Sequence, residues 1–271
     1  MKGYANPDLL WSPGRLRERL GEERLCLLDV RPTEEYVASH IPGAVHLDLF
    51  GISVNDTRPE PLASFFWMVE GLFGARGVSP EKTIVLYNGQ TGVRAARGFW
   101  LLEYFGLKDV HVLQGGFEAW EKGGHPTDKS PVKPKAAKFQ GGRVEERLAT
   151  CQSILEGLGR KDFVVVDARS DGEYFGKDVQ AKRAGRIPGA VHIEWKQNLE
   201  GGAFKEAEDL RSLYAAAGVT PEKEVVSHCQ GGYRSAHVYL ALRLLGYPRV
   251  RNYVGSWAEW GNREDLPIEA P

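Results

Sequence analysis

The residues around Cys229 have types and a spacing suited to nucleophilic chemistry at sulfur. In the run SHCQGGYRS, residues 227–235, the cysteine separates a strand-like apolar segment from a helix-like one. The backbone N–H groups of such a turn, together with the N-terminus of the following helix, stabilise an anion. For a cysteine this anion is its own thiolate, and such surroundings lower a thiol pKa from ~8.5 to roughly 3.5–7.5. We therefore predict that Cys229 is ionised at neutral pH and acts as a nucleophile.

The residues that follow Cys229 are suited to holding an anion that reacts there. The glycines permit the positive φ angles that a tight loop needs, Arg234 adds a fixed charge and Ser235 adds a hydroxyl donor. The expected substrate-binding residues in this loop are Gln230, Gly231, Gly232, Tyr233, Arg234 and Ser235. The alternative interpretation is a buried structural cysteine followed by an ordinary strand-to-helix turn.

The other sulfur and imidazole groups are weaker candidates. Cys26 lies inside the apolar run LCLLDV, where a free cysteine behaves as a core residue. Cys151 follows Thr150 at the start of an expected helix, without a glycine loop or an adjacent cation, so we expect a packing or surface role. His228 precedes Cys229 on a strand, so their side chains leave opposite faces and a Cys–His dyad is not expected. No Cys or His cluster has metal-binding spacing, and we expect neither a metal nor a cofactor.

Apolar runs and helical segments must position this loop. The runs LCLLDV, TIVLYN, FVVVDA and EVVSH are continuous rather than alternating, which favours strands buried on both faces of a parallel sheet. Residues 94–106 and 234–247 place apolar side chains at helical spacing, and each segment has a glycine at or next to its end. The expected fold class is α/β, with helices on both faces of a mainly parallel sheet. Ligands collect beyond the carboxyl ends of such strands, where Cys229 is expected to lie.

The chain contains an internal repeat, which predicts two homologous domains. The run DVRPTEEYVASHIPGAVHLD, residues 29–48, recurs after Asp167, where about eight additional residues precede IPGAVH. This insertion is basic and contains Lys177, Lys182, Arg183 and Arg186. A run rich in proline, lysine and terminal glycine separates the copies. We expect an N-terminal domain at 1–129, a linker at 130–141 and a C-terminal domain at 142–271.

The first copy lacks the nucleophile. The repeat places either Asn88 or Gly89 opposite Cys229, because the second copy's loop is one residue shorter, and neither residue can form a persulfide. Arg94 is retained. We expect the first domain to be catalytically inactive and to help enclose one cleft, since domain interfaces favour such sites.

Charge and cysteine content restrict the partners. The 35 Lys and Arg residues are balanced by 36 Asp and Glu, giving a formal net charge of -1, so no overall field favours nucleic acid or an anionic membrane. Three scattered cysteines favour a reducing compartment rather than a disulfide framework. No apolar run approaches the ~18 residues of a membrane span. We expect a cytoplasmic protein with small-molecule partners.

The chain resembles the two-domain rhodanese family of thiosulfate and 3-mercaptopyruvate sulfurtransferases. The runs DVRPTEEYVASHIPGAVHLD, DARSDGEY, IPGAVHIEW, SHCQGGYRSAH, LLGY and NYVGSWAEW follow the family's order. The resemblance implies that Cys229 takes the outer sulfur of a donor such as thiosulfate and passes it as a persulfide to cyanide or a thiol. It also implies that Arg169 binds the donor's anionic end, as bidentate guanidinium contacts allow. Asp167 is expected to brace the loop.

Three alternatives remain at this point. One related branch uses Cys-x5-Arg to hold phosphate, whereas Cys229 and Arg234 form Cys-x4-Arg, a smaller ring of amides. A persulfide relay would deliver sulfur to a protein acceptor. The third alternative is 3-mercaptopyruvate as the donor, because the loop fits the usual pattern of neither donor. In addition, Arg186 stands where the family usually has His, and Val254 stands where an Asp is expected. Arg186 is therefore a further expected substrate-binding residue, with Arg183 beside it, and thiosulfate is the favoured donor.

Overall fold

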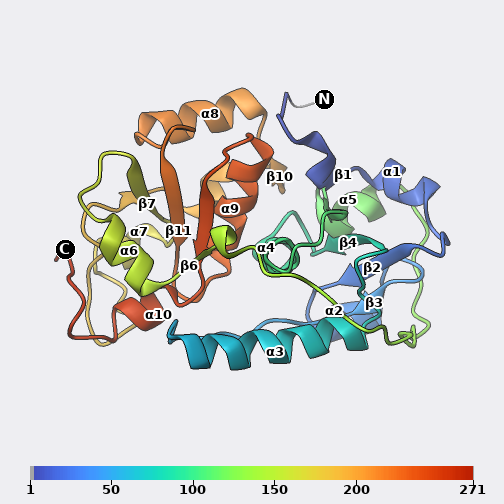
Figure 1. Cartoon of the computed structure of the whole chain (residues 1–271). Helices are drawn as coiled ribbons and strands as arrows, with labels where there is room; N and C mark the ends of the chain where they lie inside the picture. Colours follow the sequence, from blue (N-terminus) through green and yellow to red (C-terminus); the bar gives the residue numbers. More distant parts are fainter. Residues whose placement is uncertain (1–2, 271) are drawn as a thin grey trace.

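The computed structural model describes residues 3–270 and contains two parallel five-stranded sheets, one from each copy of the repeat (Figure 1). The first has the order β1 (Leu10–Trp11), β5 (Val110–Leu113), β4 (Thr83–Tyr87), β2 (Leu25–Asp29), β3 (Val45–His46). The second repeats it with β6 (Leu148–Ala149), β12 (Val250–Tyr253), β11 (Glu224–His228), β7 (Phe163–Asp167), β8 (Val191–His192). All neighbours within these sheets run parallel. The predicted α/β fold class is confirmed.

The strands form where the sequence has continuous apolar runs. Every residue of β4 and of β7 is buried, as expected for strands covered on both faces. The helices of the first copy are α1 (Pro13–Glu18), α2 (Thr33–Ala38), α3 (Pro59–Ala75), α4 (Val93–Tyr104) and α5 (Gly116–Lys122). Those of the second are α6 (Cys151–Gly157), α7 (Asp171–Tyr174), α8 (Ala207–Ala216), α9 (Arg234–Leu244) and α10 (Ser256–Trp260). Short 3-10 turns lie at Pro7–Leu9, Glu145–Arg147 and Trp195–Asn198, and β9 (Leu199–Glu200) pairs antiparallel with β10 (Ala203–Phe204).

Helices α4 and α9 join the two copies. They pack against each other between the sheets, and most of their residues are buried (Figure 1). Each helix follows the loop that leaves the central strand of its sheet, so α9 begins where the Cys229 loop ends. Gly106 and Gly246, with φ of 77° and 87°, follow the two helix ends as predicted. The cysteine loop is therefore held close to the contact between the copies.

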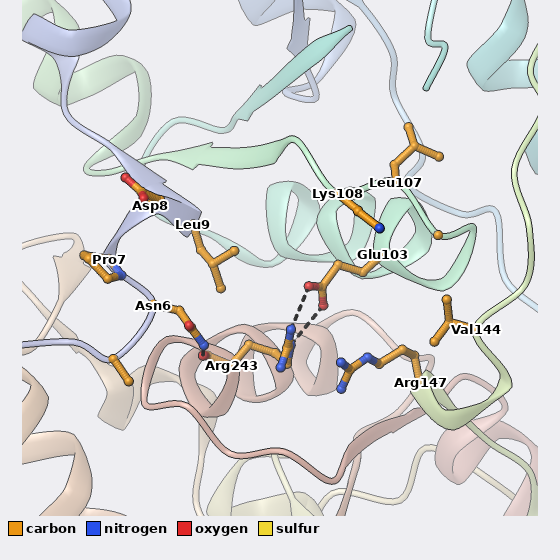
Figure 2. A pocket seen from close by; sticks show the side chains of 12 residues that line it. Asn6, Pro7, Asp8, Leu9, Glu103, Leu107, Lys108, Val144, Arg147 and Arg243 are labelled. Atoms are coloured by element: carbon orange, nitrogen blue, oxygen red, sulfur yellow. Dashed lines mark hydrogen bonds and ion pairs between the residues drawn. The ribbon is translucent and has the colours of Figure 1, made fainter. Parts of the chain in front are cut away.

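An ion pair also connects these two helices near the chain's N-terminal segment (Figure 2). Glu103 of α4 accepts hydrogen bonds from Nε and Nη2 of Arg243 on α9, at 3.2 and 3.1 Å. It also accepts one from the Tyr239 hydroxyl at 2.5 Å. Asn6, Lys108 and Arg147 lie around the same hollow (Figure 2).

Residues 131–144 connect the copies without a helix or strand. The connection follows α3, where the Ala137 N–H donates to Gly74 O at 2.9 Å and the Phe139 ring stacks on Phe73. The linker that we predicted at 130–141 overlaps this segment, and its bounds stay a prediction.

Among the residues that the structure describes, no helix has both the length and the hydropathy needed to cross a bilayer.

Candidate active site

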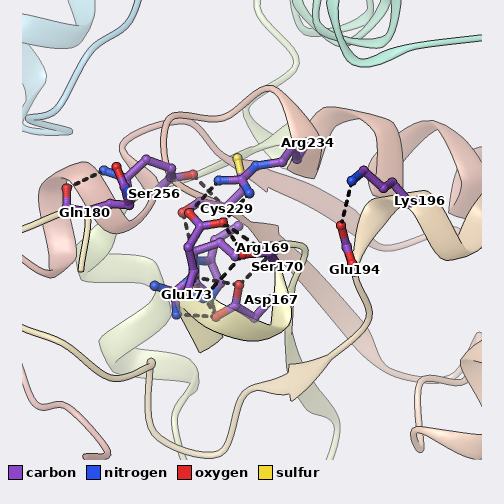
Figure 3. A network of polar contacts seen from close by, with 12 residues as sticks. Asp167, Arg169, Ser170, Glu173, Gln180, Glu194, Lys196, Cys229, Arg234 and Ser256 are labelled. Carbon is purple, nitrogen blue, oxygen red and sulfur yellow. Dashed lines mark hydrogen bonds and ion pairs between the residues drawn. The ribbon is translucent and has the colours of Figure 1, made fainter. Parts of the chain in front are cut away.

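Cys229 lies at the carboxyl end of β11, buried in the loop that leads into α9 (Figure 3). The residue is only 1% exposed. Its Sγ accepts a hydrogen bond from the Gly232 N–H at 3.2 Å, and its own N–H donates to Ser256 Oγ at 3.1 Å. Gly232 has a φ of 81°, in the left-handed region that glycine adopts more readily than other residues. The loop therefore directs backbone N–H groups at the sulfur, as the sequence predicted.

The surroundings of Cys229 favour its thiolate. Burial alone would raise the pKa of this thiol, but the positive charge of Arg234 opposes it. The amide and hydroxyl of Ser235 and the amide of Gly231 act in the same direction, and the pKa lies below its ordinary value. The Ser235 hydroxyl is buried and has no other hydrogen-bond partner among residues 3–270. This site can hold an anion on sulfur.

Arg234 is held beside the sulfur by Glu173, which the sequence analysis missed. The Arg234 guanidinium donates to both carboxylate oxygens of Glu173, at 2.5 and 2.8 Å (Figure 3). Glu173 also accepts from the amide and hydroxyl of Ser170, which fixes it at the start of α7. The sequence does carry a signal, because Glu35-Tyr36 of the first copy repeats as Glu173-Tyr174.

The Arg169 side chain pairs with Asp167 inside the protein, whereas the sequence predicted that it binds the anionic end of the donor. Its side chain is 1% exposed, and its Nε and Nη2 donate to the Asp167 carboxylate at 2.6–3.0 Å. Nη2 also donates to Gly185 O at 2.9 Å, and the guanidinium lies 4.4 Å from the centre of a Trp257 ring. Arg31 pairs with Asp29 in the same way in the first copy, which has no nucleophile. The geometry therefore supports a bracing role for Arg169 rather than contact with the donor.

Asp167 contacts groups at the ends of two neighbouring strands, and its role as a brace stays a prediction. It is fully buried at the end of β7, 3.3 Å from Nε2 of His228 on the neighbouring strand β11. Burial would raise the pKa of Asp167, but His228 and Arg169 hold it well below the usual range. The charged carboxylate thus connects the ends of the two central strands. His228 faces Asp167 rather than the sulfur, as expected from the alternation of a strand.

Arg186 and Arg183 also have protein partners. Arg186 pairs with Glu269, its guanidinium lies over the Tyr174 ring, and its side chain is 16% exposed. Arg183 donates to the carbonyls of Trp260, Arg263 and Leu266. The basic insertion therefore binds the C-terminal segment. Arg186 contacts Glu269 there, whereas the sequence predicted that it contacts a donor. The sequence spacing could not show these contacts, because the partners of Arg183 and Arg186 lie about 80 residues away in the chain.

The remaining loop residues contact both copies. Gln230 Nε2 donates to Gln180 O at 2.9 Å. The Tyr233 hydroxyl lies 2.5 and 3.1 Å from Leu49 O and Ile52 O of the first copy. Gly231 O accepts from Arg97 Nη1 at 3.3 Å. The structure thus brings the predicted loop residues together around Cys229 and places part of the first copy against them.

Ser256 is a second residue that the sequence analysis missed. Its φ of 51° is the only positive value outside glycine among residues 3–270. Its Oγ donates to Tyr253 O at 2.7 Å while it accepts from the Cys229 N–H. Such strain costs about 1–3 kcal/mol and persists where surrounding contacts enforce it. The first copy has Gly116 here, with a φ of 60°, so the replacement of GGF by GSW was the available signal.

The other two cysteines lack the features of Cys229. Cys26 is buried in the core, and burial raises the pKa of its thiol to about 11. Cys151 begins α6, at the position where a helix was predicted to start; Thr150 caps this helix, and burial raises the pKa of the Cys151 thiol also. Its Sγ lies 3.1 Å from Arg263 Nη1, a cation that is distant in the sequence and therefore was not predicted.

The first copy's loop places Asn88 where the second has Cys229. The Phe117 N–H donates to Asn88 O at 2.8 Å, and the Trp257 N–H donates to Cys229 O at the same distance. Of the two positions that the repeat left open, the hydrogen bonding selects Asn88. This loop therefore has no thiol.

Comparison with known proteins identifies the family. The rhodanese-like domain family matches residues 12–123 and 150–263. The chain is 36% identical over 270 residues to a thiosulfate sulfurtransferase of Pseudomonas aeruginosa, covering 99% of this chain and 100% of that one. It is also 36% identical over 285 residues to the sulfur carrier protein TtuD of Thermus thermophilus, covering 98% of both.

Solved structures share the fold. The anaerobic ergothioneine biosynthesis enzyme of Chlorobium limicola superposes with a TM-score of 0.85 at 24% identity, over 97% of this chain and 70% of that one. A structure of YnjE gives 0.83 at 24% identity, over 97% and 68%. Two matched domains, relatives of equal length and a shared fold lead to one conclusion: the chain belongs to the rhodanese family, with one rhodanese-like domain in each copy of its repeat.

Proposed function

We propose that this protein is a sulfurtransferase that takes sulfane sulfur from thiosulfate onto Cys229 and passes it to cyanide or a thiol. The observation that carries the proposal is the buried Cys229 sulfur, which faces loop amides and Arg234 and has a pKa below that of an ordinary thiol. Relatives that match the whole chain are named thiosulfate sulfurtransferases, which supports the same donor.

The reaction needs an anionic sulfur at the start and after each step. The Cys229 thiolate attacks the outer sulfur of thiosulfate, a new S–S bond forms, and the original S–S bond breaks as sulfite leaves with its electron pair. The acceptor then attacks the outer sulfur of the persulfide, and the Cys229 thiolate leaves. The groups that favour the thiolate, Arg234 and the loop amides, also favour the anionic persulfide.

The arginines of the insertion bear on the choice of donor. Arg183 and Arg186 are engaged with backbone carbonyls and with Glu269. Neither offers an unpaired guanidinium to the carboxylate of 3-mercaptopyruvate, so these arginines give no support for that donor. Delivery to a protein acceptor is a second candidate, supported by the relative named a sulfur carrier protein. Both candidates use the same persulfide.

The proposal is tested by following the sulfur itself. After incubation with thiosulfate and removal of the excess, peptide mass spectrometry should find one added sulfur atom on the peptide that contains Cys229. Cyanide should remove this sulfur and yield thiocyanate. Sulfur on the Cys26 or Cys151 peptide instead, or on none, would contradict the assignment. An unchanged persulfide with cyanide, together with transfer to a carrier protein, would favour the relay.

A prediction separates the two arginines of the second copy. Arg234→Met should raise the pKa of the Cys229 thiol by about one unit or more, because its charge opposes the effect of burial. A thiol is protonated below its pKa and then reacts slowly with iodoacetamide. As the pH is lowered, the alkylation rate of the variant should therefore fall at a pH about one unit higher than in the parent protein. Arg169→Met should lower stability, measured by chemical denaturation, and leave the alkylation profile unchanged.

Glu173 needs its own control, since losing Arg234 leaves this carboxylate without its cation. The double variant Arg234→Met/Glu173→Gln removes both charges and should recover part of the shift. Equal displacement of the profile by Arg234→Met and Arg169→Met would show that the two arginines do not have separate roles.

A further inference from the structure

Arg97, on α4 of the first copy, is a buried cation that the steps described above do not use. Its side chain is fully buried, and no salt bridge joins it to a carboxylate within residues 3–270. Its guanidinium donates to Gly231 O at 3.3 Å and to Ile52 O at 3.4 Å, and lies 4.6 Å from the centre of the Tyr233 ring. A buried charge is costly unless something compensates it. The group that compensates the charge of Arg97 is therefore to be sought where Arg97 contacts the loop.

The contact is with the peptide unit that faces the sulfur. The carbonyl of this unit belongs to Gly231 and accepts from Arg97, while its N–H belongs to Gly232 and donates to Cys229 Sγ at 3.2 Å. Arg97 and the sulfur thus lie at opposite ends of one peptide dipole. The approach is close, because a Cβ on Gly232 would lie 2.2 Å from Arg97 Nη1.

This arrangement has two physical effects. A peptide between two glycines rotates easily, and a bond to its oxygen holds its N–H towards the sulfur. A cation at the oxygen also polarises the peptide and strengthens the bond at the other end. In addition, burial lowers the pKa of Arg97 and the charge of the Cys229 thiolate opposes this, so Arg97 and the thiolate interact favourably.

We infer that Arg97 is a positioning residue for sulfur transfer, supplied by the first copy, which holds the Gly231–Gly232 peptide in the orientation that stabilises the Cys229 thiolate and persulfide. The inference rests on the proposed function and adds a role for the domain that has no nucleophile. Other charged groups near the loop include Arg234 of α9, Glu173 of α7, and Asp167 of β7 with its partner Arg169.

The internal repeat provides a comparison within the same chain. Arg97 and His237 occupy equivalent positions, each nine residues before the glycine that follows its helix. His237 Nε2 lies 3.3 Å from Thr91 O, in the first copy's loop. Burial lowers the pKa of His237 to about 3, so it is neutral at physiological pH. Each helix therefore contacts the opposite loop, but a charged residue faces only the loop that contains the cysteine.

The test replaces Arg97 by Met, which has a similar length and no charge. The midpoint of the alkylation profile of Cys229 should move up by about one pH unit, and kcat with thiosulfate should fall about tenfold, since the persulfide loses the same support. Arg97→Lys should recover at least half of the shift, because it keeps the charge. Arg97→His, which copies the equivalent residue of α9, is the second neutral variant if Arg97→Met does not fold.

Arg243→Met is the matched control, because it removes a partly buried cation of α9 that contacts α4, the partner of Glu103. It should lower stability and leave the alkylation profile in place. A folded Arg97→Met protein with an unchanged profile and kcat would overturn the inference, as would an equal shift in Arg243→Met. If the parent protein forms no persulfide, the proposed function fails, whereas the alkylation profiles still decide the role of Arg97.

Discussion

Cys229→Ser should reduce sulfur transfer from thiosulfate to cyanide by at least about a hundredfold, because the hydroxyl cannot form a persulfide and is not ionised at neutral pH. The fold should remain, since the side chain lies in a loop and the substitution conserves its size. Thiocyanate formation measures the activity, and the alkylation of the remaining thiols reports the fold.

Cys26→Ala is the matched control for this variant. Cys26 is also buried, but it lies within β2 of the first copy and its thiol has a raised pKa. This variant should lose stability and keep its activity. If Cys229→Ser retained more than a few per cent of the parent activity, the nucleophile would have to be another group.

Asp167→Ala should have the largest effect on stability, lowering the free energy of unfolding by about 3–5 kcal/mol, since it leaves the buried charge of Arg169 without its partner. Guanidinium or urea denaturation measures this loss. The folded-state pKa of Asp167 lies below that of the unfolded chain. The stabilisation is therefore complete above the ordinary aspartate range and disappears as the pH falls towards the lowered value.

Two further aspartates serve as controls. Asp162→Ala removes a solvent-exposed partner of Arg160 and should leave the unfolding transition close to that of the parent. Asp29→Ala breaks the equivalent pair in the first copy and should destabilise it without altering the Cys229 alkylation profile. A stable Asp167→Ala protein would show that the Arg169 charge finds another partner.

The repeat and the apolar runs were sufficient to predict the architecture. Continuous apolar runs such as 163–168 correspond to the buried central strands, because only a sheet covered on both faces accepts them. The same repeat located the loop of Cys229 and showed that the equivalent loop of the first copy lacks a thiol. Arg234 was also predictable, since it is near in sequence to the sulfur on which it acts.

The rest of the site depends on the orientation of side chains and on partners that are distant in the chain. The spacing of residues in the sequence shows neither. Arg169 is two residues from Asp167, and this local pairing turns its side chain into the protein rather than towards a donor. Glu173 and Ser256 reach the loop from separate elements, and Arg97 reaches it from the other copy. Their roles follow only from the packing of α7, α10 and α4 around the loop.

The burial of α4 by the second copy has a consequence for synthesis. Trp100 on α4 is fully buried and donates its indole N–H to Arg147 O, which lies beyond the linker. Translation proceeds at about 5–20 residues per second, so on the order of ten seconds pass between the synthesis of α4 and that of α9. During this interval the first copy presents an uncovered apolar face that contains the charge of Arg97. A product that terminates in the linker would keep this face permanently and be prone to aggregation.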